Sequence, residues 1–179
     1  MEDPKSTVRI GYKNDFKYNL KNAMLANVLG DILTLRYTET LREEEGGTYG
    51  AGAGASLSKR PVEKASLQVN FDCNPDKVEQ LIVIVHNEIE KIAKGEIEQL
   101  DLDKTLTSYI KDRKQKQDYN SYDMGVITNY VLEGYNMNDP KNFENIVNDI
   151  TAKDLQDFTK KLLKGADTYE IVFKPEMKN

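Results

Sequence analysis

The sequence feature that most constrains this chain is the stretch Leu41–Leu57, LREEEGGTYGAGAGASL. An apolar helical pattern ends in Arg42, an acidic run and a Gly-Gly break follow, and Tyr49 opens a strict alternation of glycine and alanine. Alternation with period two predicts a strand over Thr48–Ser58. A strand interior this rich in glycine is weak by itself and suits the close approach of another backbone. The rest of the fold therefore has to hold this strand in place.

The predicted strand has two unlike faces. One carries Tyr49, Ala51, Ala53, Ala55 and Leu57, and the other carries Gly50, Gly52, Gly54 and Ser56. A short connection with a proline, Lys59–Glu63, leads to Lys64–Cys73, where apolar and polar residues alternate. The inward residues there are Ala65, Leu67, Val69 and Phe71. This alternation is typical of a half-buried antiparallel strand, so the two strands are expected to pair.

Before this pair of strands, Thr7–Tyr12 is predicted as a strand and Lys13–Asp15 as a turn in which Asn14 or Asp15 caps a helix. Apolar residues then recur at helical spacing from Phe16 to about Glu44, and Gly30-Asp31 is expected to divide them into two helices.

After the strands, further helices are expected from Asn74-Pro75 to Gly95, over Leu100–Tyr119, over Ser121–Glu133, around Phe143–Ile150, and from a capping box at Thr151–Asp154 to Gly165. Thr168–Phe173 closes the chain as a strand with Tyr169, Ile171 and Phe173 on one face. We therefore predict a single α+β domain over residues 1–179, an antiparallel or mixed sheet with helices on one face.

Composition excludes several classes of protein. The net charge of −5 argues against a nucleic-acid surface, and the densest basic run, Lys111–Lys116, is predicted to be a solvated face. The longest apolar run, Leu81–Val85, is far shorter than the ~20 residues of a membrane span. Met1–Lys5 is polar and no signal peptide is visible, so the compartment stays open between cytoplasm and periplasm.

The chain does not carry the ligands of a zinc protease. His86 is the only histidine, and it could reach Glu90 one helical turn on. Two ligands do not make a zinc site, and the sequence H-x-x-E-H needs two histidines. Cys73 is a single cysteine at a strand end, where a packed thiol is expected. The glycine run lacks the G-x-G-x-x-G and G-K-[ST] patterns of nucleotide loops.

Arg42 and Tyr49 remain, and two interpretations of them stay open. In one, Arg42 is an ion-paired arginine at a helix C-terminus and Tyr49 is a packed strand tyrosine. In the other, a fixed cation with a fork of donors and a neutral phenol converge on one polar target. Such donors stabilise the oxyanion that forms when a carbonyl is attacked.

At these residues the sequence resembles the C-terminal, non-zinc-binding half of the M16 (insulinase/pitrilysin-like) zinc peptidases. The pattern L-R-E-x-x-G-x-x-Y before a strand of small residues is similar to that half's arginine/tyrosine segment. The likeness continues through LQVNFDCNPDKVEQLIVIVHNEIEKIAKGEI and extends over about Thr7 to Lys174. The resemblance implies the LuxS/MPP-like metallohydrolase type of fold.

The resemblance also implies a division of labour. Zinc would be held by a homologous M16 domain, in the same chain or a separate one, and this chain would hold no cofactor. Arg42 would bind the backbone of a peptide substrate, and Tyr49 would donate to the carbonyl or its oxyanion. Without H-x-x-E-H this chain is expected to be inactive alone. Because it begins at a strand and lacks the opening hairpin of the family, it is expected to be an excised C-terminal domain of a longer protein, and an edge of its own sheet is expected to be uncovered. The alternative is a non-catalytic structural or peptide-binding domain of the same fold.

Overall fold

The computed structural model describes residues 4–44, 48–132, 134–136 and 138–175. Its strands are β1 (Ser6–Asp15), β2 (Thr48–Ser58), β3 (Lys64–Cys73) and β4 (Asp167–Phe173). Its α-helices are α1 (Leu20–Tyr37), α2 (Val78–Lys94), α3 (Gln99–Lys116), α4 (Asn120–Ile127), α5 (Asp139–Asn148) and α6 (Ala152–Leu163). Two π-helices, η1 (Thr38–Glu44) and η3 (Thr128–Leu132), and a 3-10 turn η2 (Pro75–Lys77) complete the order.

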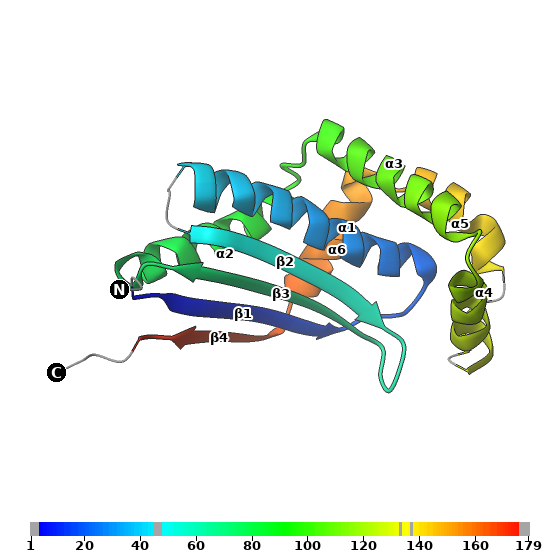
Figure 1. The fold of residues 1–179 in the computed structure, drawn as a ribbon, viewed down its shortest axis with the longest axis horizontal. Coiled ribbons are helices and arrows are strands. Elements are labelled where there is room, and N and C mark those ends of the chain that lie inside the picture. The colour runs from blue at the N-terminus through cyan, green and yellow to red at the C-terminus, as the bar shows by residue number, and fades with distance from the viewer. Residues whose placement is uncertain (1–3, 45–47, 133, 137, 176–179) are drawn as a thin grey trace.

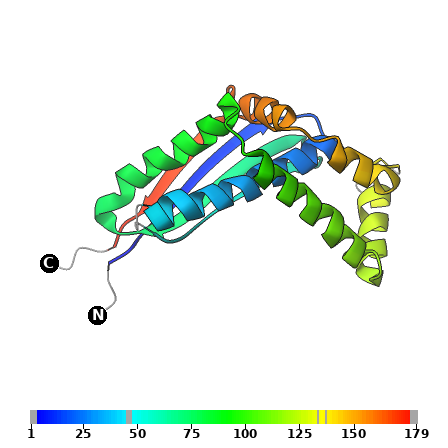
Figure 2. The same cartoon turned by 90° about the horizontal axis from the view of Figure 1, so that it is seen from above.

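The four strands form one antiparallel sheet in the order β2-β3-β1-β4. α1, α2 and α6 cover one face of this sheet, with α1 and α2 running along it and α6 packed against both (Figures 1 and 2). The predicted α+β architecture with helices on one face is confirmed, and the sheet is antiparallel rather than mixed.

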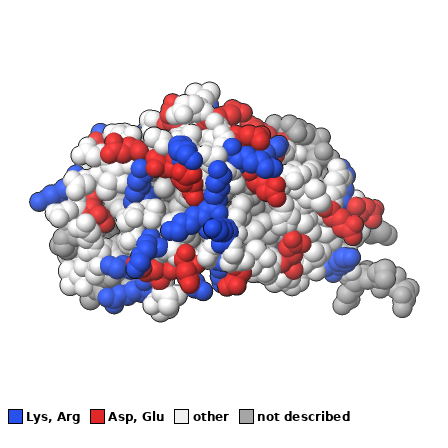
Figure 3. All heavy atoms as spheres, turned by 180° about the vertical axis from the view of Figure 1, so that it is seen from behind, with Lys and Arg blue, Asp and Glu red and all other residues white. Residues whose placement is uncertain are grey.

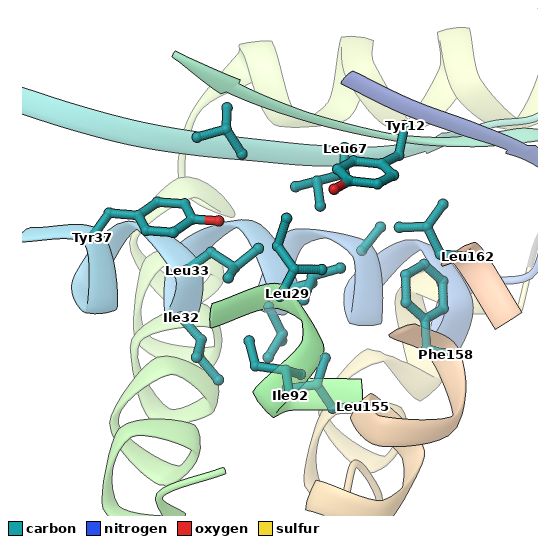
Figure 4. Packing of buried hydrophobic residues seen from close by; sticks show 14 of the residues in the cluster. Tyr12, Leu29, Ile32, Leu33, Tyr37, Leu67, Ile92, Leu155, Phe158 and Leu162 are labelled. Carbon is teal, nitrogen blue, oxygen red and sulfur yellow. The ribbon is translucent and has the colours of Figure 1, made fainter. Parts of the chain in front are cut away.

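The core lies between the sheet and these helices. Val8, Ile10 and Tyr12 of β1 point inward, as their alternation predicts. They meet leucines and isoleucines of α1, α2 and α6 in a continuous cluster, part of which Figure 4 shows: Leu29, Ile32, Leu33, Ile92, Leu155 and Leu162. Each fully buried side chain of this size stabilises the fold by about 1.5–3 kcal/mol. This burial fixes which face of each strand meets the helices.

The expected break at Gly30-Asp31 is wrong, because α1 runs unbroken from Leu20 to Tyr37. Gly30 has another function there. A Cβ built at Gly30 would lie 2.8 Å from the backbone nitrogen of Ala55. The helix therefore passes close over the backbone of β2, and only a glycine leaves room for that contact.

The predicted cap at Asn14 or Asp15 is also wrong. β1 continues through Asp15 because it pairs with β3 over that whole length. Asn19 caps α1 instead, since its side chain accepts a hydrogen bond from the Asn22 amide at 2.7 Å. Asn14 donates to carbonyls at the end of α6, including that of Lys164 at 2.9 Å. The capping box at Thr151 and Asp154 is confirmed.

The segment α3–α4–η3–α5 gathers beyond one end of the sheet (Figures 1 and 2). α4 buries none of its residues, and the helix expected over Ser121–Glu133 is divided into α4 and η3, with Glu133 outside the described residues. Arg113 departs from the predicted solvated face, because its guanidinium lies 4.2 Å from the centroid of the Phe143 ring.

Charges of both signs are interspersed on the face that Figure 3 shows. This mixture does not form the single-sign surface that nucleic-acid binding would need. In the described part of the chain, none of the helices combines the length and apolar character of a membrane span.

Candidate functional site

The backbone around Arg42 departs from a regular helix. Where α1 ends at Tyr37, the chain continues as the π-helix η1, Thr38–Glu44, which contains Arg42. Tyr37 and Leu41 are fully buried and hold this segment against the core. π-helical segments are rare and are frequent at functional sites.

The end of α1 is also fixed by polar contacts with α2. Arg36 pairs with the Glu88 carboxylate at 3.3 Å, and Lys91 pairs with the same carboxylate at 2.6 Å. Glu88 is only 4% exposed, so these two cations compensate a buried charge. The Tyr37 hydroxyl donates to the Val85 carbonyl at 3.2 Å, and burial raises its pKa well above the ordinary value. The start of η1 is thus anchored on α2.

The backbone around Tyr49 is irregular as well. In the pairing of β2 with β3, Thr48 lies opposite Cys73 and Gly50 lies opposite Asp72, so Tyr49 is an extra residue in a β-bulge. A bulge re-aims its side chain, and bulges are over-represented next to active sites.

The hydroxyl of Thr48 holds this bulge together. Its oxygen accepts from the Gly50 amide at 3.1 Å, and its one proton has the carbonyls of Gly50 and Asp72 within hydrogen-bond distance. Thr48 is 8% exposed, so water does not readily replace these contacts. The bulge at Tyr49 therefore has an internal support that the sequence analysis missed.

Both predicted site residues lie in these irregular segments, which pack against each other as η1 and β2. The side chains of Arg42 and Tyr49 lie outside the described part of the structure, as do residues 45–47. The structure therefore places the two backbones and leaves the predicted convergence of the two side chains as a prediction.

The open face of the sheet begins beside the bulge. A hollow of about 520 Å³ lies there, lined by residues of all four strands: Thr7, Arg9, Gly50, Gln68, Asn70, Phe71, Asp72 and Tyr169. The glycine lane of β2 lies on this face, and nothing in the described structure lies within 4 Å of a Cβ built at Gly50, Gly52 or Gly54. The close approach of another backbone to this strand is that of α1 at Gly30, whereas on the open face no described atom comes close to these three glycines.

His86 joins α2 to two strands rather than to Glu90. Its Nδ1 is in hydrogen-bond contact with the Tyr12 hydroxyl, and its Nε2 lies 2.7 Å from a carboxylate oxygen of Glu170 on β4. Burial, with Glu170 and Glu90 nearby, raises the pKa of Tyr12 to about 12. Tyr12 and Glu170 lie 74 and 84 positions from His86 in the sequence, so no local pattern could have revealed these contacts.

Cys73 is fully buried, as expected of a packed thiol, and this burial raises its pKa. The described residues contain no group of three or more histidine, cysteine, aspartate or glutamate side chains that could hold a metal ion. They therefore do not fit the ligand set of a zinc peptidase.

A family model decides the relationship of the chain. The model of the peptidase M16 inactive domain matches residues 2–109, which is more than half of the 179 residues. The chain belongs to this family. The resemblance found at Arg42 and Tyr49 is therefore confirmed at the level of the family, and a search of curated proteins found no match.

Solved structures share the fold of this M16 domain. It is similar to the periplasmic protease PqqL from Escherichia coli, with a TM-score of 0.84, 18% identity and 98% of this chain covered. It is similar to a protease from Helicobacter pylori, with a TM-score of 0.79, 20% identity and 96% covered. It is also similar to a peptidase M16 inactive domain from Pseudomonas fluorescens, with a TM-score of 0.79, 14% identity and 99% covered.

This chain spans only part of each of those proteins. It covers 20% of the PqqL chain, 41% of the Helicobacter protein and 42% of the Pseudomonas protein. The likeness therefore establishes the fold of one M16 domain, and the activity of any whole protein remains to be argued from the site.

Proposed function

We propose that this chain is the substrate-binding, catalysis-assisting domain of an M16-type zinc metalloendopeptidase. Arg42 and Tyr49 would serve a zinc site that a homologous M16 domain holds, in the same chain or a separate one. The observation that carries this proposal is their placement, one in a π-helix and the other in a β-bulge, on the two sides of the connection 45–47. Backbone irregularities of these two kinds are over-represented at functional sites, which supports a functional role for both residues.

Each residue has a chemistry suited to a peptide bond under attack. The Arg42 guanidinium is always charged and presents a fork of donors to backbone carbonyls. The Tyr49 phenol is a neutral donor near pH 7 and can bind the oxygen that becomes negative. The zinc of the partner domain, when bound, supplies an activated water and polarises the carbonyl.

The open face of the sheet supports a peptide as the substrate. The hollow beside the bulge offers the carboxamides of Gln68 and Asn70, which both donate and accept hydrogen bonds as a peptide backbone does. The glycine lane next to it leaves room for a chain to lie against β2. A substrate seated there would pass Tyr49 without crossing the helical layer.

The proposal is tested in the assembly of this chain with its zinc-bearing domain. Tyr49→Phe is expected to lower peptide turnover by roughly 10²-fold, the effect of losing one oxyanion donor. Tyr119→Phe is the matched control, because Tyr119 is 64% exposed in the turn between α3 and α4, and it should leave turnover unchanged. Equal turnover of wild type and Tyr49→Phe would instead favour the non-catalytic structural or peptide-binding domain.

A second measurement tests where the metal resides. Elemental analysis should find far less than one zinc per molecule of this chain alone and one zinc per assembled pair. Tightly bound stoichiometric zinc in the isolated chain would overturn the division between the two domains.

A further inference from the structure

The two edge strands of the sheet, β2 and β4, differ in whether their outward backbone groups are bound. On β2, the amide and carbonyl of Ala53 that face away from β3 are bound by the Thr34 hydroxyl of α1, at 2.9 and 3.0 Å. β4 forms the opposite edge, and among the described residues no strand pairs with its outer side. An edge strand left in this state is a template for pairing with another chain.

β4 also presents an apolar row on the open face of the sheet. Tyr169, Ile171 and Phe173 are 36%, 43% and 52% exposed. The Tyr169 ring lies against Gly11, where an added Cβ would come within 2.2 Å of it, and the Arg9 guanidinium lies 5.6 Å from the centroid of the Phe173 ring. Both rings are thus already held on β1, and pairing would cost little side-chain entropy.

We infer that β4 pairs antiparallel with β4 of a second copy of this chain, about a two-fold axis at Ile171. This register pairs five residues of each strand, 169–173. It sets Tyr169 opposite Phe173, and Glu170 opposite Val172. Aromatic cross-strand pairs stabilise a sheet by about 0.2–1 kcal/mol, and this register opposes no like charges.

The neighbouring registers are worse for identifiable reasons. With Glu170 on the axis, the two glutamates face each other and Phe173 lies opposite Asp167. With Val172 on the axis, only residues 171–173 of the strands pair. With Tyr169 on the axis, residues 167–171 also pair without opposing like charges, but Asp167 lies opposite Ile171 and Phe173 has no partner. The Ile171 register is therefore the five-residue overlap that sets apolar side chains opposite one another on the open face and avoids like charges in opposition.

The resulting dimer is isologous, as two-fold pairs are. Its sheets join into one continuous sheet with the helices of both copies on the same side. Glu170 stays bound to His86 of its own chain on the helical side. The inference uses only the edge strand, and it does not depend on the proposed function.

Sedimentation of the 179-residue chain over a range of concentrations tests the surface. The wild type should form a concentration-dependent dimer, and Ile171→Lys should raise the dissociation constant at least tenfold. Ile127→Lys is the matched control, because Ile127 is 54% exposed on α4 and should not affect dimerisation. A chain that is monomeric throughout, or a dimer weakened by Ile127→Lys and not by Ile171→Lys, would overturn the inference.

Cross-linking tests the register. One cysteine is added on β4 in each of three variants, Glu170→Cys, Ile171→Cys and Val172→Cys, and each variant is treated with a short bismaleimide. The wild type, which has only the buried Cys73, gives the background rate of cross-linking. Only the residue on the two-fold axis meets its own copy, so Ile171→Cys should link at least tenfold faster than the other two. A preference for position 170 or 172 would show that the register is wrong.

Discussion

Thr34 and Ala53, one on α1 and the other on β2, are joined through both polar groups of the Ala53 backbone. The Thr34 hydroxyl oxygen accepts from the Ala53 amide at 2.9 Å, and its one proton has the carbonyls of Gly30 (2.9 Å) and Ala53 (3.0 Å) within hydrogen-bond distance. A side chain of the helical layer therefore occupies a position on the sheet edge where another strand would otherwise bind. This contact holds the glycine-rich strand that the sequence alone leaves weak.

Removing the Thr34 hydroxyl should destabilise the domain. Thr34→Val keeps the shape and leaves the Ala53 amide and carbonyl without this partner, so the free energy of unfolding should fall by about 1–3 kcal/mol. Thr34→Ser retains the hydroxyl and should lose less. Urea unfolding measures both, and an equal loss in the two variants would show that packing rather than hydrogen bonding matters here.

Two glycines in helices should respond oppositely to alanine. Gly30→Ala places a Cβ 2.8 Å from the Ala55 nitrogen, so α1 and β2 must separate and the free energy of unfolding should fall by about 1–3 kcal/mol. At Gly125 of α4 a Cβ meets nothing within 4 Å. Gly125→Ala should therefore gain helix propensity, up to about 1 kcal/mol. Stabilisation by Gly30→Ala in urea unfolding would contradict the close approach.

The Thr48 hydroxyl should matter for both the bulge and Tyr49. Thr48→Val removes the acceptor of the Gly50 amide, so the amide resonance of Gly50 should shift and the bulge should relax. If Tyr49 serves catalysis, peptide turnover of the assembled enzyme should fall although Tyr49 itself is intact. Thr48→Ser keeps the hydroxyl and should retain most of the turnover. If Thr48→Val changes the Gly50 amide resonance but keeps full peptide turnover, the geometry of the bulge is not needed for catalysis.

Acid should weaken the capping box at the start of α6. Burial raises the pKa of Asp154, but hydrogen bonds from Thr151 and the nearby Lys21 outweigh it, so the pKa lies below its ordinary 3.8. A carboxylate with a lowered pKa in the folded state stabilises the fold above about pH 3.8, and this contribution is lost as pH falls through the folded-state pKa.

The corresponding variant is Asp154→Asn. It should be less stable than the wild type by up to about 1 kcal/mol at pH 7, and the difference should shrink towards pH 2. Free energies of unfolding across this pH range measure the effect. A difference that stays constant with pH would show that the charge of Asp154 is not involved.

Lys59 should tether the β2–β3 connection to the segment that follows η3. Its ammonium donates to the Gly134 carbonyl and lies 5.9 and 5.5 Å from the ring centroids of Tyr18 and Tyr135. Lys59→Met should cost about 1 kcal/mol and speed amide hydrogen exchange in α4 and η3. Lys59→Arg keeps the cation and should exchange nearly as slowly as the wild type. Unchanged amide hydrogen exchange in Lys59→Met would show that Lys59 does not tether the two segments.

Much of the fold followed from local patterns. The alternation of Val8, Ile10 and Tyr12 predicted which face of β1 is buried, and the alternation of β3 did the same. Thr151 and Asp154 predicted a capping box that the structure contains. These predictions succeed because each depends on residues within one turn or one strand.

The predictions that failed depended on distant residues. Gly30 suggested a helix break, because a glycine in mid-helix is locally unfavourable, and the contact with Ala55 that explains it lies 25 positions further along the chain. The contacts of His86 with Tyr12 and Glu170 span still longer separations of 74 and 84 positions.

For the candidate site, the sequence by itself proposed two residues, Arg42 and Tyr49, and predicted the glycine-alanine strand beside them. Only the tertiary structure decided that Arg42 lies in a π-helix, that Tyr49 lies in a bulge closed by Thr48, and that α1 covers the β2 edge while no described strand pairs with the outer side of β4. Residue types and their spacing are local properties of a chain, whereas strand register and the covering of an edge arise from hydrogen bonds between segments that only folding brings together.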